Sequence, residues 1–323
     1  MEKVIIGVDI GGTSIKIGII DESGDILKKW QIPTDLQDAG SNIVHDIWLS
    51  ILKNIRSQRI EKHMIIGIGV GAPGFIDGRT GVVDEAVNLG WKNYALKDRL
   101  NELSGLPVFV DNDANTAVLG ENWKGAGEQA KNVIAITLGT GVGGGIIANG
   151  TVLNGENGTA GEIGHITVDP NGKQCNCGRK GCLETIASAT GIAHQAMAII
   201  EKDPESLLAK RYKQKKTITA KDVFDLAFSG DEVSMRIIDY TCDVLGFAIA
   251  NLAAVVNPSK ILIGGGVSKA GDALLDGIRS SFDKYALGRL SDVCELKIAQ
   301  LGNDAGIIGA AFLVKQQLHH MTF

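Results

Sequence analysis

The sequence predicts a two-domain α/β protein, and three observations support that prediction. The chain has 323 residues, a length typical of about two domains. Short β-branched runs alternate along it with stretches of helical periodicity, a pattern typical of α/β folds. The third observation is an internal repeat, because a strand, glycine turn and strand near Asp9 return near Thr137, an offset of 128 residues. We therefore expect two related α/β domains that face each other across a cleft.

The composition excludes several classes of protein. Hydrophobic residues make up 44% and charged residues 21% of the chain, as in an ordinary globular protein. The formal net charge of −5 argues against a nucleic-acid partner bound by a basic face. Glycine is in excess, with 42 residues where about 23 are usual, so we expect many tight turns or close backbone approaches to a ligand.

Neither a membrane segment nor a disulfide scaffold is expected. The apolar run at the N-terminus stops at Asp9, and the run Val244–Val256 is interrupted by Asn251 and is shorter than the ~20 residues that cross a bilayer. These features predict a cytoplasmic protein. Five cysteines are too few for a disulfide framework in a chain of this size. Cys242 and Cys294 stand alone, and we expect both to be buried thiols.

The first domain is expected to cover residues 1–113. Its strands are short β-branched runs that end at glycine or aspartate, and its helix carries isoleucine at helical spacing. The expected elements are strands at 4–8, 15–20, 65–70 and 108–110 and a helix at 43–55. A helix at 114–123, capped by Asn112 or Asp113, then opens the second domain.

The second domain is expected to cover residues 114–302. Its elements are strand, turn and strand at 132–148, a loop-rich stretch at 151–185, helices at 186–200 and 231–256, and a strand at 261–263. Residues 201–216 are charge-rich, and we interpret them as a solvated surface excursion. A last helix at about 303–323, capped by Asn303 or Asp304, is expected to return to the first domain.

Two glycine turns form a candidate phosphate site. Asp9-Ile-Gly11-Gly12-Thr13 and Thr137-Leu-Gly139-Thr140-Gly141 each lie between two strands, where backbone N–H groups can converge on an anion. Asp9 could meet phosphate-bound Mg²⁺, and Lys16 could neutralise phosphate charge. The alternative is that both are plain hairpin turns. The second turn leads into a strand rather than a helix, which argues against a dinucleotide fingerprint, and the sequence contains no P-loop motif.

Three cysteines form a candidate metal site. Cys175, Cys177 and Cys182 lie in one glycine-bearing knuckle, and His165 stands ten residues before the first of them. Three thiolates and an imidazole complete a tetrahedral structural Zn²⁺ site without an open position. Such a metal would fix the segments that carry Glu162 and Glu184, whose carboxylates could bind the hydroxyls of a small polar ligand; otherwise they are plain surface acids.

An acid pair follows the strand at 108–110. Asp111 and Asp113 flank Asn112 at a strand-to-helix junction, the place where α/β sheets bind ligands. Either carboxylate could accept a proton from a substrate hydroxyl, and the residues alone do not decide between them. A plain helix cap is the alternative.

Together these motifs resemble one family. The segments Asp9–Thr13, Asn112–Asn115, Leu138–Gly145, Gly161–His165 and Cys175–Glu184 resemble the ROK family of sugar kinases and repressors, and within it the bacterial ATP-dependent glucokinases. The resemblance runs from about residue 4 to residue 314. It implies the sugar-kinase/actin-like ATPase (ribonuclease H-like) fold, with two domains that close on their ligands.

The resemblance also implies residue roles. It makes the protein an ATP:hexose 6-phosphotransferase, with Asp113 as general base, Mg²⁺-ATP as donor and glucose as acceptor. The sugar-binding residues it implies are Gly74, Asn88, Asn112, Asp113, Glu162, His165 and Glu184. His165 would bind zinc through one ring nitrogen and a sugar hydroxyl through the other. The ATP-binding residues would be Asp9, Gly11, Gly12, Thr13, Lys16, Thr137, Gly139, Thr140, Gly141, Gly264, Gly265 and Gly266.

Alternatives within the family remain. The acceptor could be fructose, mannose or an N-acetylhexosamine, and the donor could be polyphosphate. A sugar-responsive repressor is disfavoured, because only eight residues precede Asp9 and we expect no DNA-binding domain. The resemblance implies a homodimer or homotetramer.

Overall fold

A computed structural model describes residues 3–321 of the chain. It divides into two compact units. Unit 1 contains the residues up to Gln129, Gly145–Gly161 and those from Gln300 onward, and unit 2 contains Ala130–Gly144 and Glu162–Ala299. The sequence placed the boundary near residue 113, whereas residues 114–129 lie in unit 1 because the helix they contain packs against the last helix of the chain.

A five-stranded mixed sheet organises unit 1, in the order β3-β2-β1-β4-β8. Its strands are β1 (Val4–Ile10), β2 (Ser14–Asp21), β3 (Ile26–Pro33), β4 (Ile65–Ala72) and β8 (Val108–Asn112). β1, β2 and β3 are antiparallel neighbours, while β4 pairs parallel to both β1 and β8. The carboxyl ends of β1, β4 and β8 therefore lie along one edge, and this edge carries Asp9, Gly74 and Asp113 at or just after the strand ends.

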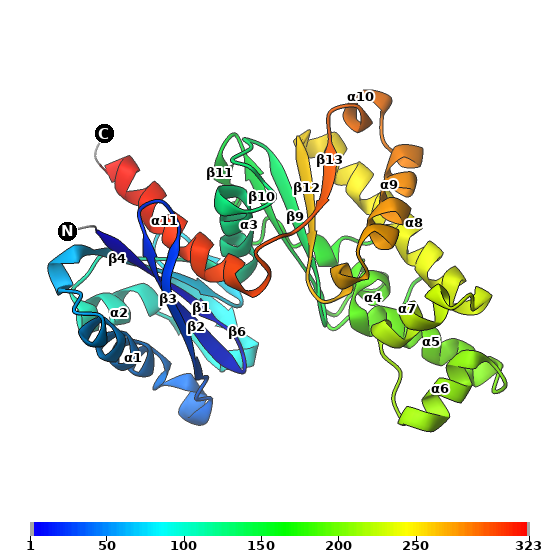
Figure 1. Ribbon diagram of the computed structural model, residues 1–323, viewed down its shortest axis with the longest axis horizontal. Coiled ribbons are helices and arrows are strands. Elements are labelled where there is room, and N and C mark those ends of the chain that lie inside the picture. Colours follow the sequence, from blue (N-terminus) through cyan, green and yellow to red (C-terminus); the bar gives the residue numbers. More distant parts are fainter. Residues whose placement is uncertain (1–2, 322–323) are drawn as a thin grey trace. The chain divides into compact units, whose positions relative to one another are not determined.

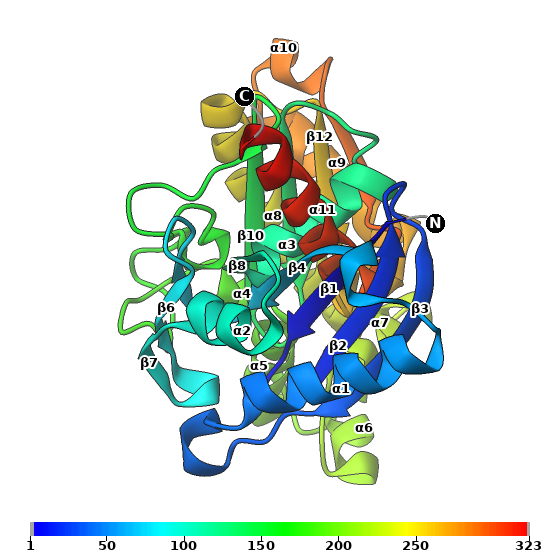
Figure 2. The ribbon, with the colours of Figure 1, turned by 90° about the vertical axis from the view of Figure 1, so that its left-hand side faces the viewer.

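Helices cover both faces of this sheet. The helices α1 (Ile43–Ser57) and α2 (Leu96–Ser104) lie on one face, and α3 (Asp113–Lys124) and α11 (Ala305–Met321) lie on the other. Figure 2 shows α1 in front of β1 and β2, with α11 behind the sheet. A small antiparallel sheet of β5 (Phe75–Asp77), β6 (Val82–Ala86) and β7 (Trp91–Tyr94) lies between β4 and α2 in the sequence.

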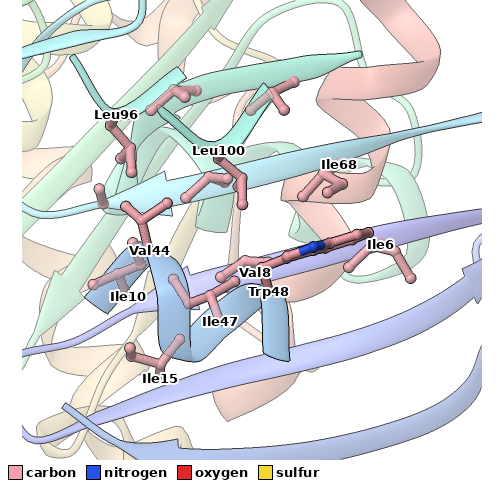
Figure 3. Packing of buried hydrophobic residues seen from close by; sticks show 14 of the residues in the cluster. Ile6, Val8, Ile10, Ile15, Val44, Ile47, Trp48, Ile68, Leu96 and Leu100 are labelled. Carbon is pink, nitrogen blue, oxygen red and sulfur yellow. The ribbon is translucent and has the colours of Figure 1, made fainter. Parts of the chain in front are cut away.

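The core of unit 1 explains its uninterrupted apolar strands. Ile6, Val8 and Ile10 point toward α1, where they pack with Ile47 and Trp48 (Figure 3). The residues between them on β1 face α11, and Ile5 packs there with Ile307 and Ile308. A strand buried on both faces gives a continuous hydrophobic run instead of alternation, and that is the pattern in this sequence.

Unit 2 repeats the same strand plan. The second five-stranded sheet has the order β11-β10-β9-β12-β13, with β12 parallel to β9 and β13 and with β10 antiparallel to β11. β11 and the end of β10 lie within Gly145–Gly161, which belongs to unit 1. The strands are β9 (Val133–Leu138), β10 (Val142–Ala148), β11 (Thr151–Val152), β12 (Lys260–Gly264) and β13 (Glu295–Ile298). The boundary between the two units falls within β10. The expected repeat is therefore present as topology, because β9 and β10 take the places of β1 and β2.

The helices of unit 2 include the longest in the described chain. They are α4 (Glu184–Ala187), α5 (Ala189–Lys202), α6 (Leu207–Lys215), α7 (Ala220–Phe228), α8 (Glu232–Val256), α9 (Asp272–Tyr285) and α10 (Gly288–Ser291). Between residues 3 and 321, α8 alone is long and apolar enough by length and composition to cross a membrane. Half of its apolar window is buried, and it packs against α7 and α9 (Figure 1), as expected for a core helix.

Most of the elements expected from the sequence are confirmed, with some corrections. The strands at 4–8, 15–20, 65–70 and 108–110 and the helix at 43–55 are present, and Asn112 caps α3 as expected. Cys242 and Cys294 are buried. The expectation for 201–216 was incomplete, because α6 lies there and buries Leu208 and Ala209. The expected last helix is preceded by a short 3₁₀ turn at Gly302–Asp304 and begins at Ala305; residues 322–323 of its expected range lie outside the described residues.

Glycine permits a very close crossing of α3 and α11, which gives a first prediction. A Cβ at Gly309 would overlap the carbonyl oxygen of Thr116, whereas a Cβ at Gly288 would meet no atom within 4 Å. Gly309→Ala is expected to lower the free energy of unfolding by about 2 kcal/mol or more, because two backbones must separate. Gly288→Ala, the matched control, is expected to change it by less than about 0.5 kcal/mol or to stabilise slightly. Urea unfolding measures both, and equal midpoints for the two variants would contradict this account.

Candidate active site

The first glycine turn brings Asp9 and Lys16 together. The two residues are paired across β1 and β2, and the Lys16 Nζ donates to Asp9 Oδ2 at 3.2 Å. The turn itself closes through the Gly11 N–H, which donates to the Ser14 carbonyl at 3.1 Å. The backbone of α11 approaches Asp9 closely from the other side, because a Cβ at Gly306 would stand 2.7 Å from the Asp9 carboxyl carbon.

Asn112 connects the end of β8 to two neighbouring segments. Its Oδ1 accepts from the Ala114 N–H at 2.8 Å and caps α3. Its Nδ2 donates to the carbonyl of Gly74 at 3.0 Å. Asn88 lies near the first turn, 3.9 Å from where a Cβ of Gly12 would stand, and its side chain is exposed. Unit 1 thus brings the predicted residues Gly74 and Asn112 into contact.

Asp111 and Asp113 occupy very different environments. Asp111 is 5% exposed, and its carboxylate accepts from the Asn112 N–H at 2.7 Å, from Asn115 Nδ2 at 2.8 Å and from Asn154 Nδ2 at 3.4 Å. Burial raises the pKa of Asp111, while these hydrogen bonds act to lower it. Asp113 is half-buried at the first position of α3, where the helix N-terminus favours a carboxylate.

The second glycine turn is held by the start of α5 and by Glu184. The Gly139 N–H donates to the Gly141 carbonyl at 2.9 Å, and the Gly139 carbonyl accepts from Ala189 N–H at 2.9 Å. Glu184 Oε2 accepts from the Val142 N–H at 3.0 Å. A Cβ at Gly141 would overlap that carboxylate, so glycine is what allows Glu184 to approach.

Gly264–Gly266 pass beside the same turn. Gly264 pairs with Thr137 across β12 and β9. Gly265 has φ +88°, and a Cβ there would stand 2.5 Å from the Leu138 carbonyl oxygen. The close approach and the left-handed backbone both require glycine at this position.

The three cysteines and His165 form a compact cluster. All four ligand atoms lie within 4.8 Å of one another, with Cys177 Sγ 3.6 Å from Cys182 Sγ and Cys175 Sγ 3.7 Å from His165 Nδ1. Zinc–sulfur bonds of about 2.3 Å in a tetrahedron separate two sulfurs by about 3.8 Å, so the donor set and its spacing fit Zn²⁺. A hydrogen bond from the Arg179 backbone, with one from its side chain, lowers the pKa of Cys177 to about 6, whereas burial and the hydrogen bond to Cys177 raise the pKa of Cys182 to about 12. Cys177 is therefore the thiol that is more readily a thiolate.

Two carboxylates lie beside the cluster. His165 directs Nδ1 toward the cysteines and Nε2 toward Glu162, whose Oε2 is 4.0 Å away. Glu184 Oε1 lies 4.0 Å from Cys175 Sγ. Arg179 donates to the His165 carbonyl at 2.7 Å. Unit 2 therefore places Glu162, His165 and Glu184 beside the metal cluster and joins Glu184 to the glycine turn.

A cavity of about 440 Å³ adjoins the second glycine turn at Thr140. Thr140 of the turn, the first half of α5 and residues 217–220 line it. The walls are mostly apolar, with Met197 and Ile218 among them, and threonine hydroxyls supply polar groups. Such a pocket suits a flat, partly apolar ligand group.

Several residues that position the site were not predicted. Asn115 and Asn154 hold Asp111, Arg179 holds the His165 backbone, and Gly306 faces Asp9. The motif Asn112–Asn115 contained Asn115, but its partner Asn154 lies in a loop that carries no recognisable pattern.

The fold and these clusters are those of a known class of proteins. The model of the ROK family matches residues 5–317, and the chain belongs to that family. Its fold is accordingly the sugar-kinase/actin-like ATPase fold, as the sequence predicted.

Within the family, the chain is similar over nearly its whole length to proteins named glucokinase. The chain is 55% identical to a glucokinase of Halalkalibacterium halodurans over 99% of this chain and 97% of the relative. It is 38% identical to a glucokinase of Thermotoga maritima, over 97% of this chain and 98% of that one. The crystal structure of a Streptomyces griseus ROK family glucokinase in complex with glucose and AMPPNP matches with TM-score 0.78 and 37% identity, covering 97% of this chain and 99% of that chain.

The metal cluster gives the second prediction. Cys177→Ser is expected to lower zinc content and to raise KM for the sugar about tenfold or more, because His165 and Glu184, the sugar ligands that the family resemblance implies, lose the group that would orient them. Elemental analysis and steady-state kinetics measure the two effects. Cys294→Ser, which removes a thiol outside the cluster, is the control and is expected to retain zinc. Loss of zinc with an unchanged sugar KM would refute the coupling.

Proposed function

We propose that this protein is a glucokinase that transfers the γ-phosphoryl group of ATP to the 6-hydroxyl of glucose. The observation that carries the proposal is 55% identity to a glucokinase across 99% of the chain. The crystal structure of the Streptomyces griseus relative with glucose and AMPPNP supports both substrates. The two units contain the residue types that such a reaction needs: a carboxylate base, phosphate-binding turns and groups that bind hydroxyls.

Asp113 is the proposed general base. Three amide donors already occupy the buried Asp111 carboxylate, which leaves it poorly placed to receive a substrate proton. Asp113 lies at the half-buried start of α3, next to the cap residue Asn112. A carboxylate there can hold the 6-hydroxyl by hydrogen bonding and accept its proton as the oxygen attacks phosphorus.

Sugar hydroxyls are proposed to bind Asn112 and the backbone at Gly74 in unit 1, with Asn88 close by. In unit 2 the proposed sugar ligands are Glu162, Glu184 and the Nε2 of His165. When bound, Zn²⁺ would supply a rigid anchor on Nδ1 of the same imidazole, and this anchor fixes the direction of Nε2. The metal is thus structural, and the sugar contacts are made by protein groups.

The donor is proposed to bind through both glycine turns. Since the N–H groups of Gly11 and Gly139 close their own turns, we expect the following N–H groups, at Gly12, Thr13, Thr140 and Gly141, to face phosphate oxygens. Asp9 would meet Mg²⁺, which spreads the charge of the transferring group when bound, and Lys16 both orients Asp9 and offsets phosphate charge. The nucleoside is proposed to occupy the cavity beside Thr140, close to Gly264–Gly266.

Cellular context is also proposed. The full-length identity to bacterial glucokinases supports a cytoplasmic enzyme, and the resemblance to the family supports a homodimer or homotetramer. Light scattering coupled to size-exclusion chromatography measures the oligomer.

The activity is tested directly by a coupled ADP-release assay over a panel of hexoses. Glucose with ATP is expected to give the highest kcat/KM. Fructose, mannose and N-acetylglucosamine are expected to be at least tenfold poorer, because a hydrogen-bonding pocket rejects an altered hydroxyl pattern. In a parallel series polyphosphate replaces ATP. Because this donor releases no ADP, the sugar phosphate product is measured instead. Another sugar or polyphosphate as the best substrate would reassign the specificity.

The role of the base gives a further prediction. Asp113→Asn is expected to lower kcat about 10³-fold, which is typical for loss of a general base, while the glucose dissociation constant stays within a few-fold. Calorimetry measures binding, and the assay above measures turnover. A near-normal kcat in this variant would exclude Asp113 as the base.

A further inference from the structure

The corner between α6 and α7 forms one wall of the proposed nucleoside cavity. α6 ends at Lys215, Lys216 follows with a left-handed backbone at φ 61°, and Thr219 caps α7. Residues 217–220 of this corner line the cavity together with Thr140 of the glycine turn. The shape of the cavity therefore depends on how firmly the corner is held.

One carboxylate holds the corner. Asp222 is 2% exposed, and its two oxygens serve different partners. Oδ2 accepts from the Thr219 N–H at 3.1 Å, and the Asp222 N–H donates to Thr219 Oγ1 at 3.2 Å, which completes the capping box of α7. Oδ2 also accepts from the Thr219 hydroxyl at 2.6 Å. Oδ1 accepts from Lys215 Nζ and from Arg211 Nη1, both on α6. Asp222 thus ties the end of α6, the corner and the start of α7 to a single point.

Apolar burial anchors the two sides of the corner unequally, because α7 buries Val223 and Phe224 whereas α6 has few buried apolar side chains. α6 has nine residues and buries only Leu208 and Ala209, and a helix of this length is marginal without support. The left-handed backbone of Lys216 is also unfavourable for a residue with a Cβ. Burial acts to raise the pKa of Asp222, but the hydrogen bonds from Lys215 and Thr219 outweigh it and lower the pKa to about 2. The carboxylate is therefore charged at neutral pH and attracts both cations.

We infer that Asp222, with Lys215 and Arg211, is a positioning group for the nucleotide: it fixes the wall formed by residues 217–220 and so sets the affinity for ATP without touching it. The inference rests on the proposed placement of the nucleoside in this cavity. It gives a function to part of the charged segment 201–216, which the sequence alone marked as a surface excursion. Because the sugar ligands lie elsewhere, the effect is specific to the nucleotide.

Three variants and a control test this inference. Asp222→Asn removes the charge, Lys215→Met removes one partner and leaves the capping box intact, and Lys215→Arg keeps the positive charge. Asp225→Asn is the matched control, because Asp225 lies on α7 and pairs only at the exposed surface with Lys221, at 2.9 Å. The dissociation constant for AMPPNP is measured by calorimetry, and KM for ATP and glucose and kcat are measured by the coupled assay.

Asp222→Asn is expected to raise the AMPPNP dissociation constant and the KM for ATP about ten-fold, and Lys215→Met about three- to five-fold. KM for glucose and kcat at saturating ATP are expected to stay within two-fold, and Lys215→Arg and Asp225→Asn are expected to resemble the parent protein. A lower melting temperature with unchanged AMPPNP affinity in Asp222→Asn and Lys215→Met would show a merely structural role and overturn the inference. If Asp222→Asn does not fold, the AMPPNP dissociation constants of Lys215→Met and Lys215→Arg are compared instead. Equal values for these two variants would overturn the inference. If the parent protein binds AMPPNP but does not phosphorylate glucose, the proposed function is refuted. The AMPPNP affinities of the variants still test the inference in that case.

Discussion

The close packing of α11 against β1, β4 and α3 is the constraint on which unit 1 depends. Glycines at the contact points let backbone meet backbone: a Cβ at Gly7 would overlap Ile307, one at Gly69 would overlap Ala310, and one at Gly309 would overlap Thr116. The same helix presents Gly306 to the Asp9 carboxyl. Since Asp113 opens α3 and Asp9 ends β1, a single contact surface fixes the helix that carries the proposed base and the carboxylate proposed to meet Mg²⁺. A larger side chain at this surface would move both.

Glu184 has the corresponding role in unit 2. One of its oxygens accepts from the Val142 N–H beside the glycine turn, and the other lies near Cys175 of the metal cluster. The parts of this unit that are proposed to bind sugar and phosphate therefore share one side chain, which lies between the glycine turn and the cluster of Cys175, Cys177, Cys182 and His165. A structural metal held by this cluster would therefore act on the proposed site by fixing side chains, without taking part in its chemistry.

The features that could be predicted from the sequence are those that a local residue pattern determines. The strand–turn–strand repeat, the Asn112 cap and the knuckle with Cys175, Cys177 and Cys182 are local, and the structure contains each of them. The partners of Asp111 could not be foreseen, because Asn154 reaches it from a loop 43 residues away. The tie made by Asp222 was missed for a related reason: its cationic partners lie in a charge-rich segment whose composition looks like ordinary solvated surface. Distant polar contacts depend on tertiary structure, and no periodicity records them.

The repeated strand plan shows how one scaffold can carry two kinds of chemistry. β4 and β12 occupy the same position in the strand orders of the two sheets. The loops after these strands contain Gly74 at φ +96° and Gly265 at φ +88°, so both loops have a glycine with a left-handed backbone. The strands that correspond at the sheet edge, β8 and β13, differ. β8 runs into the acid pair and the cap of α3, whereas β13 is followed by Ala299 and Gln300, which offer no acid. Asp9 of the first turn is likewise Thr137 in the second. The acids proposed for proton transfer and for the metal of the donor thus lie in unit 1. In unit 2 the turn has Thr137 in place of Asp9, and the Glu184 carboxylate beside that turn accepts from the Val142 N–H.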